Sequence, residues 1–385
     1  MRYYIWYEKL PDIEIDNEYI GYELRMFEES FGRKRMENEI LVEEWSPVAE
    51  IEAFVEKSEK NYFFYLWIHP GSDEAELRSC WICNRVKAPK DIEEAFACEG
   101  EAPCMPEEFV DHDPAGIELE DGALSVQWFE EGDAAAVLMG DKIIAVIPCF
   151  SGYKGFYGYS VYAKGTGPFA WELKGAYDKF MQQTKDSAKF WDYFEDEDFW
   201  GKVQDYHMEV LEDFFGEHEK YYAIDGGEFP PKALAQGRKD GVVYGITLGV
   251  SMIPMPKVEM SYQDDYLDYR RMELAFACKE CHEPLMEGMA STISWLAAYP
   301  WQDLTFLGHG HTIPFKNIKG FDYILFLNSR MLPEIPAPAY PEFMGEKVNL
   351  LWLKPITAAE QKEIADKGVA EYLKDKDLST IHILG

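Results

Sequence analysis

A capped helix that directly follows a strand is encoded near the C-terminus of this 385-residue chain. Residues 348–353 are almost wholly apolar and long enough for one buried strand. After Pro355, Thr357 and Glu360 form a capping-box pattern, in which a hydroxyl and a carboxylate satisfy exposed amides of a helix's first turn. The apolar stripe of that helix falls on Ile364, Val369, Tyr372 and Leu373. The pattern therefore predicts a strand joined to a helix, with a last strand at residues 381–384.

The same mixture of strands and helices extends upstream to about residue 198. Apolar runs predict strands, and amphipathic periodicity predicts helices. The predicted strands are residues 242–248, 271–278 and 321–328, and the predicted helices are residues 203–215 and 285–299. Between them, the prolines of Met252-Ile-Pro-Met-Pro256 enforce an extended chain. We therefore expect an α/β (α+β) fold, with mixed sheets flanked by helices.

The first half of the chain has a different pattern, dominated by strands and loops. Residues 62–68 are rich in β-forming side chains and predict a buried strand, and Gly140-Asp141 between two apolar runs predicts a hairpin turn. From residue 174 to 199 the periodicity becomes helical. With 47% apolar residues the chain can bury a sizeable core. We predict two domains, a β-rich N-terminal companion at residues 1–185 that ends in the connecting helix and an α/β domain at residues 198–385.

The charge balance limits the partners of this protein. Asp and Glu number 71 against 37 Lys and Arg, which gives a formal net charge of −34. Such a surface repels phosphate backbones and argues against direct nucleic-acid binding. Two interpretations stay open, a solvated surface that maintains solubility or a field that attracts a basic protein.

Location and redox state follow from simpler observations. No stretch reaches the roughly 18 consecutive apolar residues of a membrane span, and the first residues lack the pattern of a signal peptide. Seven cysteines, an odd number in a long chain, favour reduced thiols. These observations predict a cytoplasmic protein without a membrane partner.

Two segments are candidates for a partner-binding surface. The first is a loop rich in glycine and aromatic residues, whose candidate anchors are Tyr153, Phe156, Tyr157 and Tyr159. Tyrosines offer rigid amphipathic contact area, but the same rings could equally be buried for packing. The second is an acidic run, Glu195, Asp196, Glu197 and Asp198. It is either a docking patch or the solvated end of a helix.

Metal binding is an alternative that the cysteines raise. The four candidate zinc ligands are Cys80, Cys83, Cys98 and Cys104. The second pair is separated by five residues, whereas a strong zinc signal repeats the two-residue spacer, so ordinary reduced thiols are preferred. Cys278, Cys281 and His282 form a close trio without a fourth partner nearby. We therefore expect no metal and no cofactor.

His309 and His311 offer a second metal alternative, because a strand would place both imidazoles on one face. No third ligand cluster is evident in the sequence. The chain also lacks a Walker loop, a dinucleotide fingerprint, a nucleophile elbow and a helical zinc-protease motif. The sequence therefore favours a protein that is not an enzyme, with a metal-dependent hydrolase as the least favoured alternative.

Five motifs in a fixed order resemble the Suppressor of fused domain family over residues 200–378. They are Leu211-Glu-Asp-Phe-Phe-Gly-Glu217, Thr247-Leu-Gly-Val-Ser-Met-Ile-Pro-Met-Pro256, Glu273-Leu-Ala-Phe276, Gly310-His-Thr312 and Leu351-Trp-Leu-Lys-Pro-Ile-Thr357. The proline-rich residues 333–341 depart from the family pattern. The resemblance implies an α/β fold without a known catalytic centre.

The resemblance also implies a binding function. Animal members are similar to two-lobed clamps that hold an extended segment of a transcription factor by strand pairing, and bacterial members look like immunity proteins of polymorphic toxin systems. We therefore expect a non-enzymatic protein that binds another protein, with an immunity protein against a toxin such as a basic nuclease as the leading form. The alternative is a general peptide-binding regulatory adaptor that uses strand addition.

Overall fold

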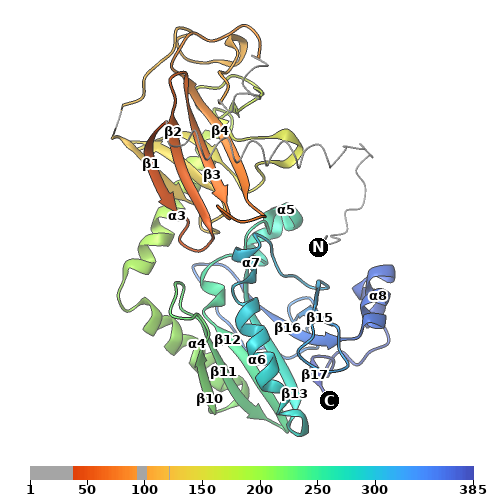
Figure 1. Cartoon of the computed structure of the whole chain (residues 1–385). Coiled ribbons are helices and arrows are strands. Elements are labelled where there is room, and N and C mark those ends of the chain that lie inside the picture. Colours follow the sequence, from red (N-terminus) through yellow and green to blue (C-terminus); the bar gives the residue numbers. More distant parts are fainter. Residues whose placement is uncertain (1–37, 93–101, 121) are drawn as a thin grey trace.

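The computed structural model describes residues 38–92, 102–120 and 122–385, and these residues form three β-sheets. Two sheets belong to the N-terminal region, defined here as strands β1 to β9. The third sheet, with strands β10 to β17, defines the C-terminal region. Figure 1 shows the two regions one above the other, joined along one side by helices α3 and α4. The predicted combination of a β-rich N-terminal part and mixed sheets with helices is confirmed.

The first sheet is an antiparallel meander of four strands in chain order. Its strands are β1 (Glu39–Trp45), β2 (Ile51–Lys57), β3 (Asn61–Ile68) and β4 (Glu76–Asn84). The predicted strand at residues 62–68 is β3, and seven of its eight residues are buried. A strand that is buried on both faces reads as a continuous apolar run, which explains why this strand was predictable from sequence.

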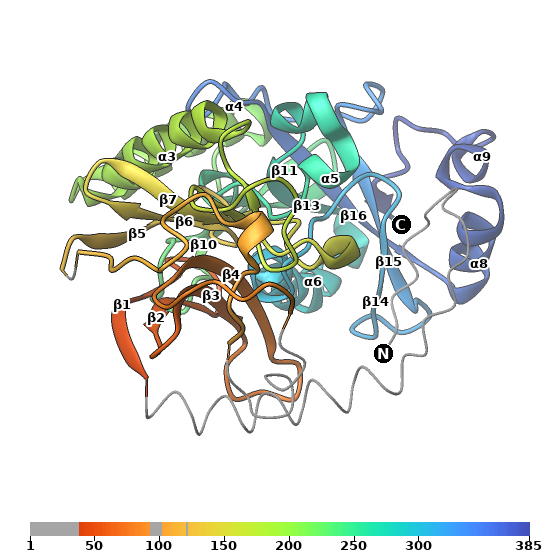
Figure 2. The same cartoon turned by 90° about the horizontal axis from the view of Figure 1, so that it is seen from above.

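The second sheet packs against the first and carries helix α3 on its other face. Its strands are β5 (Leu124–Trp128), β6 (Ala135–Met139), β7 (Lys142–Ile147), β8 (Tyr159–Ser160) and β9 (Trp171–Glu172). The predicted hairpin is formed by β6 and β7, and Gly140 in its turn has a φ of 59°, which glycine adopts without strain. Figure 2 shows the three layers in order: α3 (Tyr177–Asp192), the second sheet and the first sheet.

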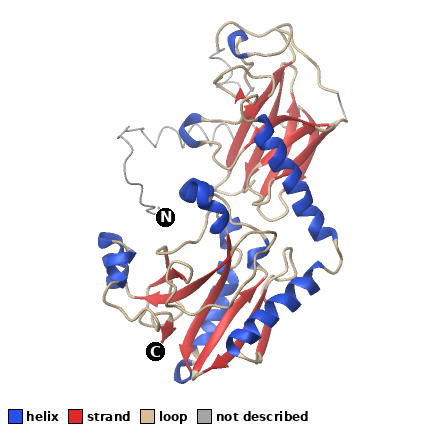
Figure 3. Cartoon of the chain, turned by 180° about the vertical axis from the view of Figure 1, so that it is seen from behind, coloured by secondary structure: helices blue, strands red, loops and turns tan. Residues whose placement is uncertain are grey.

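The helix predicted over residues 174–199 is α3, which ends earlier than predicted, and the separate helix predicted over residues 203–215 is α4, which begins earlier. Helix α3 ends at Asp192, a short 3₁₀ turn η3 (Tyr193–Glu195) follows, and α4 (Phe199–Phe215) runs in a new direction (Figure 3). The backbone is extended at Asp196, with φ −67° and ψ 115°. The turn brings the rings of Phe194 and Phe199 to a centroid distance of 5.3 Å, so these two rings pack against each other across the break between α3 and α4.

The third sheet has eight strands and is mixed, as predicted. Seven strands follow the order β10-β11-β12-β13-β16-β15-β14, and β17 pairs with β13. The pairs of β13 with β16 and with β17 are parallel, and the others are antiparallel. The bounds are β10 Lys220–Ala223, β11 Ala233–Lys239, β12 Val242–Leu248, β13 Arg271–Lys279, β14 Thr312–Pro314, β15 Tyr323–Asn328, β16 Val348–Ile356 and β17 Ile383–Leu384.

Helices cover both faces of the third sheet. One face holds α6 (Leu285–Leu296), and the other holds α4, α8 (Ala358–Lys367) and α9 (Val369–Leu373). The predicted helix over residues 285–299 therefore ends earlier, and α7 (Tyr299–Gln302) is a separate turn. Helix α5 (Glu259–Tyr262) and the 3₁₀ turn η5 (Gln263–Asp268) lie between β12 and β13 and face the N-terminal region.

The predicted capping box is present at the start of α8. The Thr357 hydroxyl accepts from the amide of Glu360 at 3.3 Å, and the Glu360 carboxylate accepts from the amide of Thr357 at 2.9 Å. This strand-to-helix unit is the local feature that the sequence determined best. The division of the chain at residues 185 and 198 into two independent domains stays a prediction.

Candidate functional site

The two regions meet at the turn between β5 and β6, residues 129–134, which we call the β5–β6 turn. Gly132 in this turn has a φ of 74°, and a side chain there would collide with Val48 and Ser46. Ser46 donates its hydroxyl hydrogen to the carbonyl of Gly132 at 2.7 Å, which fixes the turn against the first sheet. The turn can therefore present its acidic residues, Glu130, Glu131 and Asp133, rigidly to the C-terminal region.

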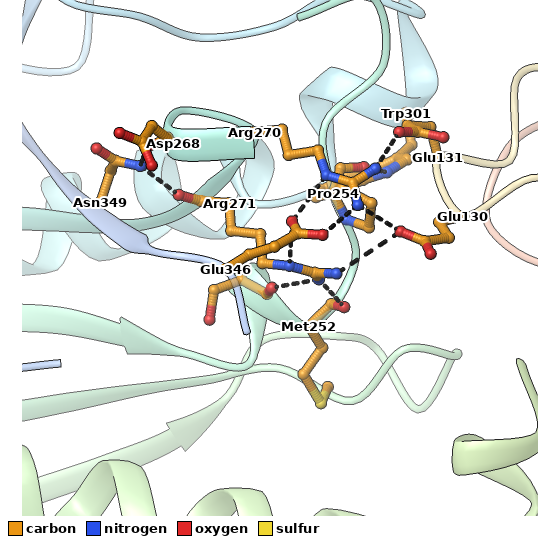
Figure 4. Close-up of polar contacts among 11 residues, drawn as sticks. Glu130, Glu131, Met252, Pro254, Asp268, Arg270, Arg271, Trp301, Glu346 and Asn349 are labelled. Carbon is orange, nitrogen blue, oxygen red and sulfur yellow. Dashed lines mark hydrogen bonds and ion pairs between the residues drawn. The ribbon is translucent and has the colours of Figure 1, made fainter. Parts of the chain in front are cut away.

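Arg270 forms ion pairs with the first two of these residues, Glu130 and Glu131 (Figure 4). Its guanidinium lies 2.5 Å from Glu131 and 2.6 Å from Glu130, and it also pairs with Glu346, whose Oε2 accepts from the Arg270 Nε at 2.7 Å. The side chain of Arg270 is buried. Planar guanidinium groups suit such multiple carboxylate contacts, because their donors are fixed in a fork.

Arg271, the next residue, completes this inter-region ion cluster. It donates to Glu346 at 3.0 Å and to the carbonyl of Met252 at 2.6 Å. Its guanidinium also stacks on the rings of Phe190 and Phe343, at 5.6 and 5.2 Å from their centroids. The two arginines and three glutamates of this cluster together carry one net negative charge. Because the cluster is buried, removal of any one partner would leave a charge without its counter-ion and destabilise the fold.

A cavity of about 640 Å³ lies beside the ion cluster. Its walls come from the β5–β6 turn, the aromatic loop after β7, the first half of α3, and α5 with η5. Both regions therefore contribute to it. Its volume is within the range of small-ligand sites in proteins.

Three acidic or thiol groups mark the buried wall of this cavity. Asp133 is 1% exposed, and neither of its carboxylate oxygens has a hydrogen-bond partner among the residues that the structure describes. Glu259 accepts from the thiol of Cys149, with 2.6 Å between oxygen and sulfur. Burial, reinforced by Glu259 and Glu131, raises the pKa of Asp133 to about 7. Burial also raises the pKa values of Glu259 and Cys149.

The predicted aromatic anchors separate into exposed and buried rings. Tyr153 is 45% exposed and lines the cavity, and Tyr157 is 40% exposed. Phe156 is 6% exposed and packs edge-on against Trp171 at 4.8 Å. Tyr159 lies between Phe156 and α3. The first two rings are therefore available to a partner, whereas Phe156 contributes to packing; the role of the loop in binding stays a prediction.

The predicted acidic run lies at the other end of α3. Asp196 pairs with Lys202 at 2.5 Å and accepts from the amide of Asp198 at 3.0 Å. Hydrogen bonding to Lys202 lowers the pKa of Asp196. Glu195, Glu197 and Asp198 are exposed or nearly so. Tyr159 packs on Phe180 near the start of α3, so roughly 18 Å of helix, the 12 residues from Phe180 to Asp192 at 1.5 Å each, separates the two predicted surfaces.

The four candidate zinc ligands are not all described, because Cys98 lies outside the described residues. Cys80, Cys83 and Cys104 are buried, and the Cys80 thiol donates to the carbonyl of Tyr159 at 3.4 Å. Burial raises the pKa values of Cys80 and Cys83, which disfavours the thiolate that a metal requires. Within residues 38–92, 102–120 and 122–385, no three His, Cys, Asp or Glu side chains are grouped to hold a metal ion.

The histidine pair lies just before β14 and not on it, so the strand geometry that the metal alternative required is not formed at these residues. His309 and His311 flank Gly310, whose φ of 85° forms a turn just before β14 begins at Thr312. His309 faces the backbone amide of Asn328, and burial lowers the pKa values of both histidines. Cys278 of the other trio is buried in β13, whereas Cys281 is exposed in the 3₁₀ turn η6 (Glu280–His282).

The proline-rich residues 333–341 pack against the third sheet. Ile335 is buried, and the indole of Trp352 on β16 donates to the carbonyl of Pro336 at 3.1 Å. Tyr340 is half-buried in the same layer, where its ring meets that of His207 on α4 at 5.7 Å. The segment that departs from the family pattern therefore covers one face of the sheet.

The family model of the Suppressor of fused protein matches residues 221–383, and this part of the chain is a Suppressor of fused domain. The predicted resemblance is thus confirmed, although the helix motif at Leu211 lies before the matched residues. No curated protein and no solved structure matches the chain. Suppressor of fused proteins are a non-catalytic family of protein-binding regulators.

In the part of the chain that the structure describes, every helix is too short or too polar to cross a membrane.

Proposed function

We propose that this protein acts without catalysis by binding another protein, and that it is a cytoplasmic immunity protein of a bacterial toxin system. The observation that carries the proposal is the Suppressor of fused domain at residues 221–383. The formal net charge of −34 favours a basic partner, such as a nuclease toxin, because complementary charge accelerates encounter. Neutralisation would then be stoichiometric coverage of the toxin's active surface.

The two predicted surfaces support different steps of such binding. Glu195, Glu197 and Asp198 are positioned to steer a basic partner, since only Asp196 of the run is held in an ion pair. Tyr153 and Tyr157 offer exposed rings that could anchor the complex once it forms. Because the two surfaces lie at opposite ends of α3, a partner that used both would have to span the length of that helix.

Co-expression tests this function. Production of the toxin encoded beside this gene should arrest growth, and co-production of this protein should restore it and yield a stable complex. If the protein neither binds nor counteracts any neighbouring toxin, the immunity function is refuted.

A charge-reversal experiment tests the steering surface. Replacing the four acids of the run by lysine should slow association with the toxin at low salt by tenfold or more and leave dissociation nearly unchanged. The matched control reverses four exposed acids of the C-terminal helical segment, Asp366, Glu371, Asp375 and Asp377. If both variants slow association equally, net charge acts as a whole and the run is not part of the interface.

A general peptide-binding adaptor is the second candidate, and the edge strand β10 favours it. Strand β10 pairs with β11 alone in the described sheet, and three of its four residues are exposed. Alternation of the antiparallel ladder places the amides of Tyr221 and Ala223 on the free edge. Ala223→Pro should abolish capture of an extended peptide by removing one donor, and Ala223→Val should retain it. Equal capture by both variants would exclude strand addition at β10.

A further inference from the structure

The cavity between the two regions has an acidic wall that the proposed function does not use. Asp133 enters it from the β5–β6 turn, and Glu259 enters it from the first turn of α5. The two residues are 126 positions apart in the chain (259 minus 133), so only the assembled structure brings them to one cavity. The space, about 640 Å³, is larger than a single water molecule or metal ion needs.

The carboxylates of this wall have unused hydrogen-bonding capacity. Within the described residues, no side chain or amide donates to either oxygen of Asp133, and no other residue donates to the Oε2 of Glu259. Each of these atoms is buried. A buried carboxylate without donors is costly, and a donor that entered the cavity would reduce that cost.

The charged groups around Asp133 are mostly engaged elsewhere. Glu131 is paired with Arg270 at 2.5 Å, and Arg78 is paired with Glu76 at 2.7 Å and donates to the carbonyl of Cys149. Arg78 and Lys257 lower the pKa of Asp133, but burial, Glu259 and Glu131 outweigh them. Asp133 and Glu259 therefore form no ion pair with a basic side chain among the described residues.

The other walls suit the apolar part of a ligand. Phe129 and Phe180 supply buried rings, and Tyr153 and Tyr266 line the more open side. Aromatic faces attract cations and also accommodate the methylene stem that carries them. Lys179 is the one basic side chain among the described lining residues, and it is exposed.

We propose that this cavity binds the primary ammonium or guanidinium group of a ligand, held between Asp133 and Glu259 with its stem against the aromatic walls. Such a group supplies the several charge-assisted donors that the two carboxylates lack. It could belong to a lysine or arginine side chain of a protein partner or to a free small amine. The inference concerns the cavity alone and does not depend on a toxin partner.

The first experiment uses the unaltered full chain and two short peptides with blocked ends, acetyl-Gly-Arg-Gly-amide and its citrulline counterpart. Citrulline keeps the shape of arginine but has no charge. Calorimetry should show binding of the arginine peptide at least tenfold tighter than that of the citrulline peptide. Agmatine, a free amine with a guanidinium group, is the third test ligand.

The results identify the source of the cation as well as testing the proposal. Binding of the arginine peptide indicates a partner's side chain, and binding of agmatine without the peptide indicates a free amine. If neither binds, or if the citrulline peptide binds as tightly as the arginine peptide, the proposal is refuted. A failure of toxin neutralisation in co-expression would leave these binding results unaffected, so the two proposals fail separately.

Variants locate the binding to the two carboxylates. Asp133→Asn and Glu259→Gln should each weaken binding of the ligand that the unaltered chain takes by tenfold or more, while Asp141→Asn, on the exposed β6–β7 turn, should not. Circular dichroism confirms that each variant is folded. Should neither cavity variant fold, the comparison of arginine with citrulline on the unaltered chain still decides the matter. Unchanged binding by folded Asp133→Asn and Glu259→Gln would place the ligand elsewhere and refute the proposal.

Discussion

Replacing Asp133 by asparagine should stabilise this protein at neutral and alkaline pH. The carboxyl has an ordinary pKa of 3.8, and burial together with Glu259 and Glu131 raises the pKa to about 7 in the folded chain. Between these two values the folded state holds a proton that the unfolded state has released. The folded state is therefore favoured by this group at low pH, and that advantage is lost as the pH rises toward 7.

The magnitude follows from the difference between the two pKa values. Each pH unit corresponds to 1.36 kcal/mol, so the gap from 3.8 to about 7 amounts to roughly 4 kcal/mol of unfolding free energy. Asparagine has nearly the same shape and no charge to bury. We expect Asp133→Asn to match the unaltered chain near pH 4 and to exceed its unfolding free energy by about 4 kcal/mol at pH 8.

Denaturant unfolding from pH 4 to pH 8 provides the measurement, with tryptophan fluorescence as the signal. The informative quantity is the difference between variant and unaltered chain at each pH, because other acids titrate in both. Asp141→Asn removes an exposed carboxylate from the same region and should show no comparable slope. A difference that is constant with pH, or that favours the unaltered chain at pH 8, would refute the account of Asp133 as a buried, unsatisfied acid.

Three further substitutions test other parts of the structure. Arg270→Met removes one arginine from three carboxylates, of which Glu130 and Glu346 keep Arg271, and should cost about 3–5 kcal/mol of unfolding free energy in denaturant; a loss below about 1 kcal/mol would show that the ion cluster does not join the regions. Thr357→Ala removes the capping hydroxyl and should cost about 1 kcal/mol, and an unchanged transition midpoint would contradict the capping role. Gly237→Ala would place a Cβ 2.1 Å from the ring of Phe215, so thermal unfolding should shift down by the equivalent of about 1–3 kcal/mol, and Phe215→Leu in the same chain should restore part of it.

The sequence predicted those strands and helices that are specified by residues close together in the chain. Strands β3 and β12 were predictable because they are buried on both faces and therefore continuously apolar. The capping box at Thr357 specifies its helix through contacts three residues apart. The end of α3 at Asp192 was misplaced because helical periodicity continues through Phe194 to Phe199, and the packing of these rings is a tertiary effect.

The candidate site was beyond sequence reasoning for a physical reason. Asp133, Glu259 and Arg270 become distinctive only when residues more than a hundred positions apart meet. In a chain with 71 acidic residues, none of these carboxylates differs from its neighbours in composition. The one available signal was the adjacent pair of Arg270 and Arg271 at the start of a buried strand, because two charges there require partners.

The β5–β6 turn should tolerate insertions less well than hairpin turns usually do. Hairpin turns normally accept insertions, since they lie in solvent and make few contacts. The exposed turn at Gly140 and Asp141 should behave in that way. One extra residue near Gly132, however, would displace Glu130 and Glu131 from Arg270 and open the cavity wall at Asp133. Two neighbouring hairpins of one sheet should thus diverge at different rates in evolution, one free to lengthen and the other held to a single length.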